Sequence, residues 1–133
     1  MKIRSLFIPA ILLTFASFPQ SKQMIRVIST HPFDITVKQV KYVLNKKSMH
    51  LFLQTDHVKD AESVGAELMP AHLFVFGYST IGTKLMQCDQ RVGIELPLKI
   101  LVWEDDRNDV WIGYKNPLWL AEYYDLKDYS KPF

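Results

Sequence analysis

The chain of 133 residues contains a single cysteine, Cys88, so no disulfide can form within it. Its stability must therefore come from side-chain packing rather than from covalent cross-links. A redox role for the thiol would need a resolving partner, which the sequence does not supply. We expect Cys88 to be a small, buried residue of a helix.

Metal-binding spacings are also missing. No two of the four histidines are three or four residues apart, and there is no CxxC motif, whereas dedicated zinc sites use such spacings. The side chains left for ligation are scattered ones, namely His57, Met86, Cys88 and Glu104. We therefore expect no metal and no cofactor.

Excess charge is small, with 16 basic residues against 14 acidic ones. Two of the basic residues, Lys2 and Arg4, lie in an N-terminal leader, and without them 14 basic residues face 14 acidic ones. Non-specific binding to nucleic acid or to an anionic membrane rests on clustered positive charge. We expect no nucleic-acid partner.

The leader lacks a hydrophobic run long enough to span a membrane. Its apolar stretch extends from Leu6 to Phe15, against the roughly twenty residues that a spanning helix needs. Basic residues followed by an apolar run and then small residues are typical of a secretory signal peptide. We predict a signal peptide over residues 1–20, cleaved near 16–21, then a connector at 21–23. The mature protein would be periplasmic or secreted, without a stable membrane anchor.

The remaining sequence predicts one α+β domain over residues 24–126, with residues 127–133 as a tail. Alternating or continuous apolar runs predict strands, and apolar residues at helical spacing predict helices. The expected strands cover residues 24–29, 49–55, 72–77, 96–104 and 110–114, and the expected helices cover 34–46 and 116–124. We predict a mainly antiparallel sheet, in β-α-β-β-β-β-α order with short helical insertions, packed against two helices.

The stretch HLFVFGYSTIGTKLMQ (72–87) has glycines at the spacing of a phosphate-binding loop. That motif requires a lysine directly after the second glycine, whereas Thr83 and Lys84 stand in the reverse order. Nucleotide binding is therefore disfavoured. We interpret Gly77 and Gly82 as turn residues, and Ser79 and Thr83 as caps of two short helical turns.

Other residues are assigned to turns, caps and strand faces. Asn116 and Pro117 predict the start of a helix, and Pro97 is assigned to a turn. Asn108 or Asp109 is expected in the left-handed conformation of a hairpin turn. Alternation places Leu51 and Leu53 on one face of their strand. In the same way, Lys99, Leu101 and Trp103 share a face.

Several ordered motifs occur together, namely GAELMPAHLFVFG, FGYSTIGTKLMQ, GIELPLKILVWED and VWIGYKNPLWLA. With them the chain resembles the domain of unknown function 302 family from about Met24 to Leu126. The resemblance implies a compact domain with an antiparallel sheet backed by helices, often paired as a homodimer. It implies no established activity.

The candidate polar site comprises Asp56, His57, Lys99 and Glu104. A carboxylate beside His57 would suit acid–base chemistry. However, neighbouring side chains in a strand point to opposite faces. We therefore favour Asp56 as a capping residue, with His57 hydrogen-bonded in a turn. Lys99 lies within an apolar strand, so it must reach water, pair with an acid or face a ligand anion. We favour pairing with an acid such as Glu104, Asp56 or Asp105.

We predict a binding or interaction module for a small ligand or a protein. One alternative is a small periplasmic enzyme, redox or hydrolytic, that uses His57 with Glu104 or Asp56. The other is a structural homodimer, which needs a large exposed apolar patch.

Overall fold

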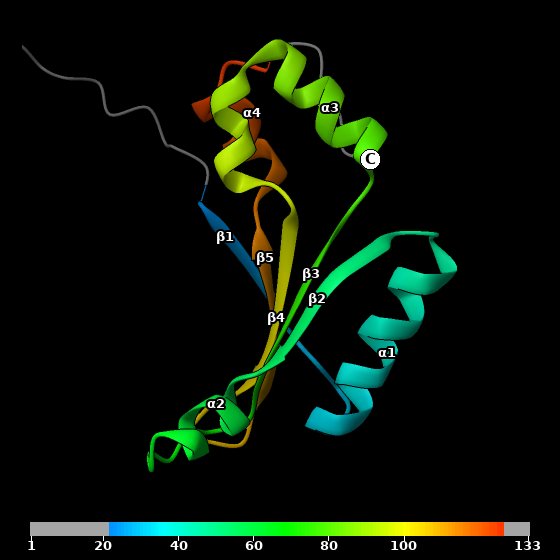
Figure 1. The fold of residues 1–133 in the computed structure, drawn as a ribbon. Helices are drawn as coiled ribbons and strands as arrows, with labels where there is room; N and C mark the ends of the chain where they lie inside the picture. Colours follow the sequence, from blue (N-terminus) through cyan, green and yellow to red (C-terminus); the bar gives the residue numbers. More distant parts are fainter. Residues whose placement is uncertain (1–21, 127–133) are drawn as a thin grey trace, which may run out of the picture.

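The structure, a computed structural model, describes residues 22–126, which form one antiparallel sheet with helices on one face and at both ends (Figure 1). The strands are β1 (Met24–Ile28), β2 (His50–Asp56), β3 (Ala71–Gly77), β4 (Leu98–Glu104) and β5 (Val110–Lys115). The helices are α1 (Phe33–Lys46), α2 (His57–Ser63), α3 (Ser79–Cys88), the 3₁₀ helix η1 (Gln90–Glu95) and α4 (Pro117–Tyr123). The predicted α+β class is confirmed, and the predicted signal peptide and tail lie outside the described residues.

The strand order is β1-β5-β4-β3-β2, and every neighbouring pair is antiparallel. Side chains alternate between the two faces of a sheet, so Phe74 and Phe76 of β3 lie on the same face as Val102 of β4. Helix α1 covers this face (Figure 1). We call the buried residues there the sheet cluster, which comprises Leu44, Phe74, Phe76, Val102 and Val110.

Helix α1 is anchored to β1 by one buried hydroxyl. Thr36, only 1% exposed, donates to the carbonyl oxygens of His31 and Pro32, each at 3.1 Å, and lies 2.7 Å from the Ser29 hydroxyl. Buried hydroxyls are stable only when they are hydrogen-bonded, and these contacts meet that need. They hold the first turn of α1 against the strand that precedes it.

A β-bulge in β2 changes which side chains it presents to the core. Leu51 pairs with Phe76, but the register shifts before Leu53, which pairs with Val75 on the opposite face. Leu51 therefore packs against the sheet cluster, whereas Leu53 is 53% exposed. The expectation that both leucines share a face is wrong, because one extra residue reverses the alternation beyond it.

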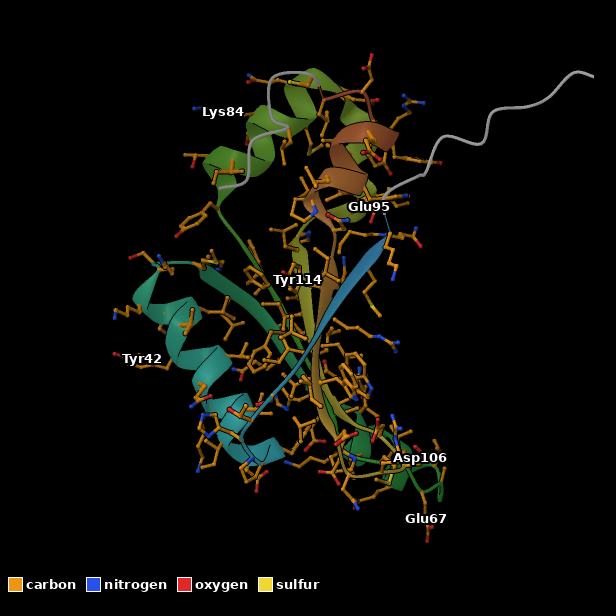
Figure 2. All side chains as sticks on the ribbon, turned by 180° about the vertical axis from the view of Figure 1, so that it is seen from behind. Tyr42, Glu67, Lys84, Glu95, Asp106 and Tyr114 are labelled. Atoms are coloured by element: carbon orange, nitrogen blue, oxygen red, sulfur yellow. The ribbon has the colours of Figure 1, made fainter. Side chains whose placement is uncertain are left out.

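A second hydrophobic cluster sits at one end of the sheet, where α3, η1 and α4 pack together (Figure 1). We call it the helical cluster, and its buried residues are Leu85, Val92, Trp119, Leu120, Tyr124 and Leu126. Figure 2 shows the two ends of the molecule, with Lys84 and Glu95 at the helical end and Glu67 and Asp106 at the other. The sheet strands connect these ends.

The hairpin turn between β4 and β5 is organised by Asp105. Its carboxylate accepts bonds from the backbone N–H groups of Arg107 and Asp109 and from Nε1 of Trp111, the last at 2.9 Å. The Trp111 bond, aided by the two backbone bonds, lowers the pKa of Asp105. Asn108 adopts the left-handed conformation, with φ of 61°, in agreement with the sequence expectation.

The sheet side opposite α1, which we call the open face, is also apolar. Its apolar residues are Met24, Ile28, Leu53, Leu73, Val75, Leu101, Trp103 and Trp111, all outside both buried clusters of the described residues. Arg26, Thr55 and Lys99 project from the same side. Trp103 stacks on Trp111 with ring centroids 6.3 Å apart. A Cβ at Gly113 would lie 2.7 Å from the Trp103 ring, so glycine makes room for it. Among residues 22–126, no helix is sufficiently long and apolar to cross a bilayer.

Candidate ligand cavity

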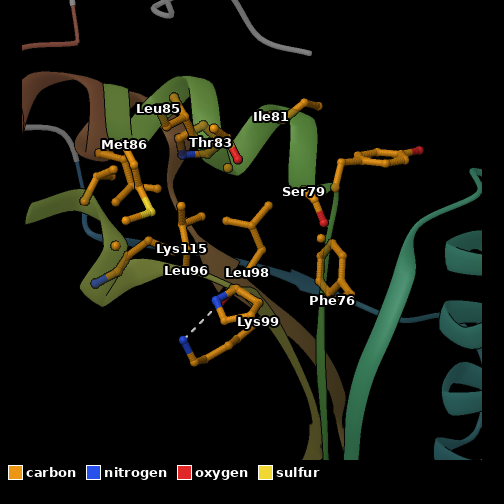
Figure 3. Close-up of a pocket in the computed structure, with 18 of the residues that line it drawn as sticks. Phe76, Ser79, Ile81, Thr83, Leu85, Met86, Leu96, Leu98, Lys99 and Lys115 are labelled. Atoms are coloured by element: carbon orange, nitrogen blue, oxygen red, sulfur yellow. Dashed lines mark hydrogen bonds between the residues drawn. The ribbon is translucent and has the colours of Figure 1, made fainter. Parts of the chain in front are cut away.

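A cavity of about 560 Å³ lies where the sheet cluster and the helical cluster meet. Its sheet side is formed by the ends of the central strands, including Phe76, Leu98 and Ile100, and its helical side includes Leu85 and Leu120. Figure 3 shows Leu96 and Leu98 on the sheet side of α3. The walls are mainly apolar, as in ligand pockets whose few polar groups orient the ligand.

Helix α3 forms the outer wall, and its sequence explains its orientation. Ile81 and Leu85 recur at helical spacing, and both pack in the helical cluster. Gly82 lies between them, and a Cβ there would make an ordinary contact of 3.5 Å with Leu96. The hydroxyl of Tyr78, just before the helix, donates to the carbonyl of Lys47 after α1. This bond ties the start of α3 to the end of α1.

Two lysines line the cavity, and their surroundings differ. Lys115 lies 3.2 Å from the Glu95 carboxylate and 4.4 Å from the Trp119 ring centroid. The Tyr124 hydroxyl also donates to Glu95, at 3.3 Å. Burial raises the pKa of Tyr124, and the nearby Glu95 charge adds to the rise. Lys115 is thus part of a structural network that joins β5 to the helical cluster.

Lys99 instead reaches the surface. Its side chain is exposed, and Nζ donates to the carbonyl oxygen of Pro97 at 3.0 Å. No carboxylate of residues 22–126 lies within ion-pair distance of it. The favoured pairing of Lys99 with Glu104, Asp56 or Asp105 is therefore wrong in the described part of the chain, because Lys99 lies at the other end of the sheet.

Asp56 and His57 lie at the end of the sheet away from the cavity. Asp56 is the N-cap of α2, and its carboxylate accepts a bond from the Val58 N–H at 3.1 Å. The carboxylate nearest to His57 is Asp60, with 3.4 Å between Nδ1 and Oδ2. Both side chains of that pair are exposed, and neither lines the cavity.

Glu104 ends β4 at this same end, where its backbone N–H donates to Pro70. The strand register explains this separation. Lys99 pairs with Val75, toward the end of β3, whereas Trp103, the residue before Glu104, pairs with Ala71, at the start of β3. The structure thus places Asp56, His57 and Glu104 at one end and Lys99 at the other. The four residues do not form one site.

The predicted turn and cap residues fall mostly at the helical end. Asn116 is the N-cap of α4, with Pro117 as its first residue, and Gly77 ends β3. Pro97 follows a cis peptide bond between η1 and β4. Gly82 and Thr83, in contrast, lie inside α3, so Thr83 does not cap a second helical turn. Ile81 and Leu85, one turn apart on either side of Gly82 and Thr83, pack in the same cluster, which fits one continuous helix.

Sequence reasoning missed most of the cavity. Its residues come from segments that are far apart in the sequence, including Met49, Leu96, Tyr114 and Ala121. The stretch 72–87, which drew attention for its glycines, supplies much of one wall. Cys88 is exposed at the end of α3, so the expectation of a buried thiol is wrong. Within residues 22–126, no cluster of three His, Cys, Asp or Glu side chains is arranged to hold a metal ion.

Comparisons with known proteins match this chain to longer relatives. Fluoride-specific ion channel FluC 1 of Brucella suis biovar 1 is 34% identical over 103 residues, covering 77% of this chain and 41% of that protein. Fluoride-specific ion channel FluC 2 of Brucella melitensis biotype 1 is also 34% identical over 103 residues, covering 77% of this chain and 38% of that protein. The chain therefore spans about two fifths of the length of these curated relatives.

A solved structure has the same fold. The crystal structure of an uncharacterized conserved protein DUF302 from Bacillus stearothermophilus matches with a TM-score of 0.70 and 16% sequence identity. The match covers 80% of this chain and 86% of that chain. The family model described as Domain of unknown function DUF302 matches residues 25–132. The chain therefore belongs to the DUF302 family.

Proposed function

We propose that this chain is an exported binding module that holds a small, mainly apolar ligand in the cavity between α3 and the sheet. The main support for this proposal is the cavity itself. Its volume of about 560 Å³ falls within the roughly 300–1,000 Å³ typical of ligand sites. An unfilled apolar space forfeits packing energy. A ligand that filled it would recover that energy.

The remaining support comes from the sequence and from the relatives. Lys2 and Arg4 precede a short apolar run, an order that favours export. The matched segment is one part of the longer Brucella proteins, which fits a module that works beside other segments. The enzyme alternative has less support, because His57 pairs with the exposed Asp60 and neither lines the cavity.

Filling the cavity from the α3 wall tests this function. Gly82→Phe adds a ring beside Leu96, and we expect it to weaken binding of the neutral fluorescent probe N-phenyl-1-naphthylamine about tenfold or more. Gly82→Ala is the matched control. It adds only one methyl group, and alanine within a helix is more stable than glycine by up to about 1 kcal/mol. We therefore expect a stable variant that still binds the probe.

The measurement is a fluorescence titration of the purified chain and both variants, with circular dichroism to verify folding. Failure of the original chain to bind the probe would contradict the proposal. Equal binding by folded Gly82→Phe would also contradict it, because the ring would then leave the ligand site untouched.

A second candidate function is homodimerisation through the open face. Antiparallel sheets that face water usually carry polar side chains there, whereas this face is lined mainly by apolar ones, with Arg26 and Lys99 also on it. Met24, Ile28 and Leu53 on it are each at least half exposed. A second copy that presented the same face would cover these side chains on both partners, as a two-fold symmetric interface requires.

A charge on the open face tests this second function. We expect Leu53→Glu to convert a dimer into a monomer, because a carboxylate buried in such an interface would be unpaired. Val64→Glu is the control, since Val64 is 79% exposed at the end of α2 and away from that face. Sedimentation velocity at several concentrations distinguishes the two forms. A monomeric original chain would reject the dimer.

A further inference from the structure

Within residues 22–126, the charged residues that line the cavity all have the same sign. Lys99 and Lys115 line it, and among the described residues no aspartate or glutamate does. The neighbouring Glu95 is held by Lys115 at 3.2 Å, so its charge is already compensated. The cavity is therefore an apolar space whose charged lining residues are both cations, and one of them is in a structural ion pair.

Lys99 is the cation that remains available. With respect to residues 22–126, its one hydrogen bond goes to the carbonyl oxygen of Pro97, while an ammonium group has three donors. A carbonyl dipole does not neutralise the charge. Lys99 lines the cavity and lies farther from α3 than Leu98 (Figure 3). Strand alternation directs its exposed side chain to the opposite side of β4 from Leu98, so the ammonium group lies outside the apolar interior.

We infer that the ligand is an amphipathic anion, with an apolar tail in the cavity and a single carboxylate head at Lys99. This inference rests on the proposed binding function and specifies its ligand class. Apolar walls stabilise the tail by removing it from water, at about 0.8 kcal/mol for each buried methylene. The carboxylate head would form a charge-assisted hydrogen bond with Lys99 while it stays in contact with solvent.

The same geometry disfavours two other ligand classes. A cationic head would meet the like charge of Lys99, and among the described residues no carboxylate lines the cavity to offset it. A neutral apolar molecule would fill the cavity but leave Lys99 without an ionic partner. The order of affinity for ligands with one common tail should therefore follow the charge of the head group.

A tail-matched series tests this inference. Decanoate, decanol and decylamine compete with N-phenyl-1-naphthylamine for the purified chain and two lysine variants. We expect decanoate to compete best and decylamine worst. Lys99→Gln should weaken the binding of decanoate about fivefold and leave the binding of decanol unchanged, because an exposed ion pair contributes up to about that factor in affinity. Lys84→Gln, on α3 but outside the cavity lining, is the control and should change neither.

Salt adds a second readout, because screening weakens exposed ion pairs and leaves apolar contacts intact. The preference for decanoate over decanol should therefore shrink as salt rises. Equal competition by decanoate and decanol would overturn this inference and leave the binding function standing. A decanoate preference that Lys99→Gln does not reduce would also overturn it. If the fluorescent probe itself did not bind, the proposed function would fail first.

Discussion

The sheet cluster and the helical cluster are both apolar, yet they are packed differently. In the sheet cluster, Phe74 and Val102 are completely buried between the strands and α1. The helical cluster buries Val92 equally well, but Leu85 also lines the cavity. Apart from Phe76, which also lines the cavity, the buried residues of the first cluster fill their space and stabilise the fold. The second leaves space at its junction with the sheet, and that space is where we place the ligand.

The difference follows from what each helix packs against. Helix α1 lies on the sheet face, where strand side chains meet its apolar residues over its length (Figure 1). Helices α3 and α4 lie beyond the strand ends and pack mainly against each other and η1. Strand ends offer fewer side chains than a sheet face, so the junction is incompletely filled.

The largest expected effect comes from truncating one residue in each cluster. Phe74→Ala should lower the free energy of unfolding by about 3–5 kcal/mol, because the site is closed on all sides and cannot collapse. Leu85→Ala should cost less, about 2–3 kcal/mol, since it enlarges a space that already exists. Urea denaturation followed by circular dichroism measures both.

The comparison depends on the order of those two values. If Leu85→Ala proved as costly as Phe74→Ala, the helical cluster would be as tightly packed as the sheet cluster. The cavity would then be filled in solution by rearranged side chains. Equal denaturant slopes for the two variants would show that the difference lies in the native state.

A smaller effect should come from His72, which lies next to Phe74 with ring centroids 4.8 Å apart. Within the described part of the chain, its Nε2 is a buried polar atom without a hydrogen-bond partner. Burial lowers the pKa of His72 from its ordinary value of 6.5, and Asp56 opposes this while His57, Lys41 and Lys59 add to it. The folded state therefore favours the neutral form of His72 more than the unfolded chain does.

The pH dependence follows from that direction. As pH falls below 6.5, the unfolded chain takes up a proton at His72 before the folded chain does, so stability decreases until the lowered pKa is passed. We expect His72→Phe to remove this part of the decrease. The readout is the urea midpoint at pH 7.5 and at pH 5. His31→Gln is the control, because His31 is exposed. If the urea midpoint of His72→Phe decreased between pH 7.5 and pH 5 as much as that of the original chain, the effect would belong to other residues.

Local features of the fold were predictable because they depend on neighbouring residues. Asn116 and Pro117 start α4, because a side-chain acceptor followed by proline favours a helix start wherever the segment lies. Lys99, Leu101 and Trp103 share a face, because strand alternation is a property of the backbone. The helix near residues 34–46 follows from its apolar spacing.

Features that depend on distant partners were not predictable in this way. The bulge at β2 places Leu53 on the open face, since pairing with β3 decides the register. Asp56, His57 and Glu104 share one end of the sheet and Lys99 lies at the other, because strand direction and length separate them. No local pattern marks such separations.

By itself, the sequence determined the class of the domain, most of its strands and helices, and its family membership, because these depend on local periodicity and ordered motifs. The tertiary structure alone decided where the apolar residues leave space and which lysine stands beside that space without an acid partner among residues 22–126. The physical reason is that a cavity is formed by the packing of whole elements, and its walls come from segments that meet only when the sheet has formed.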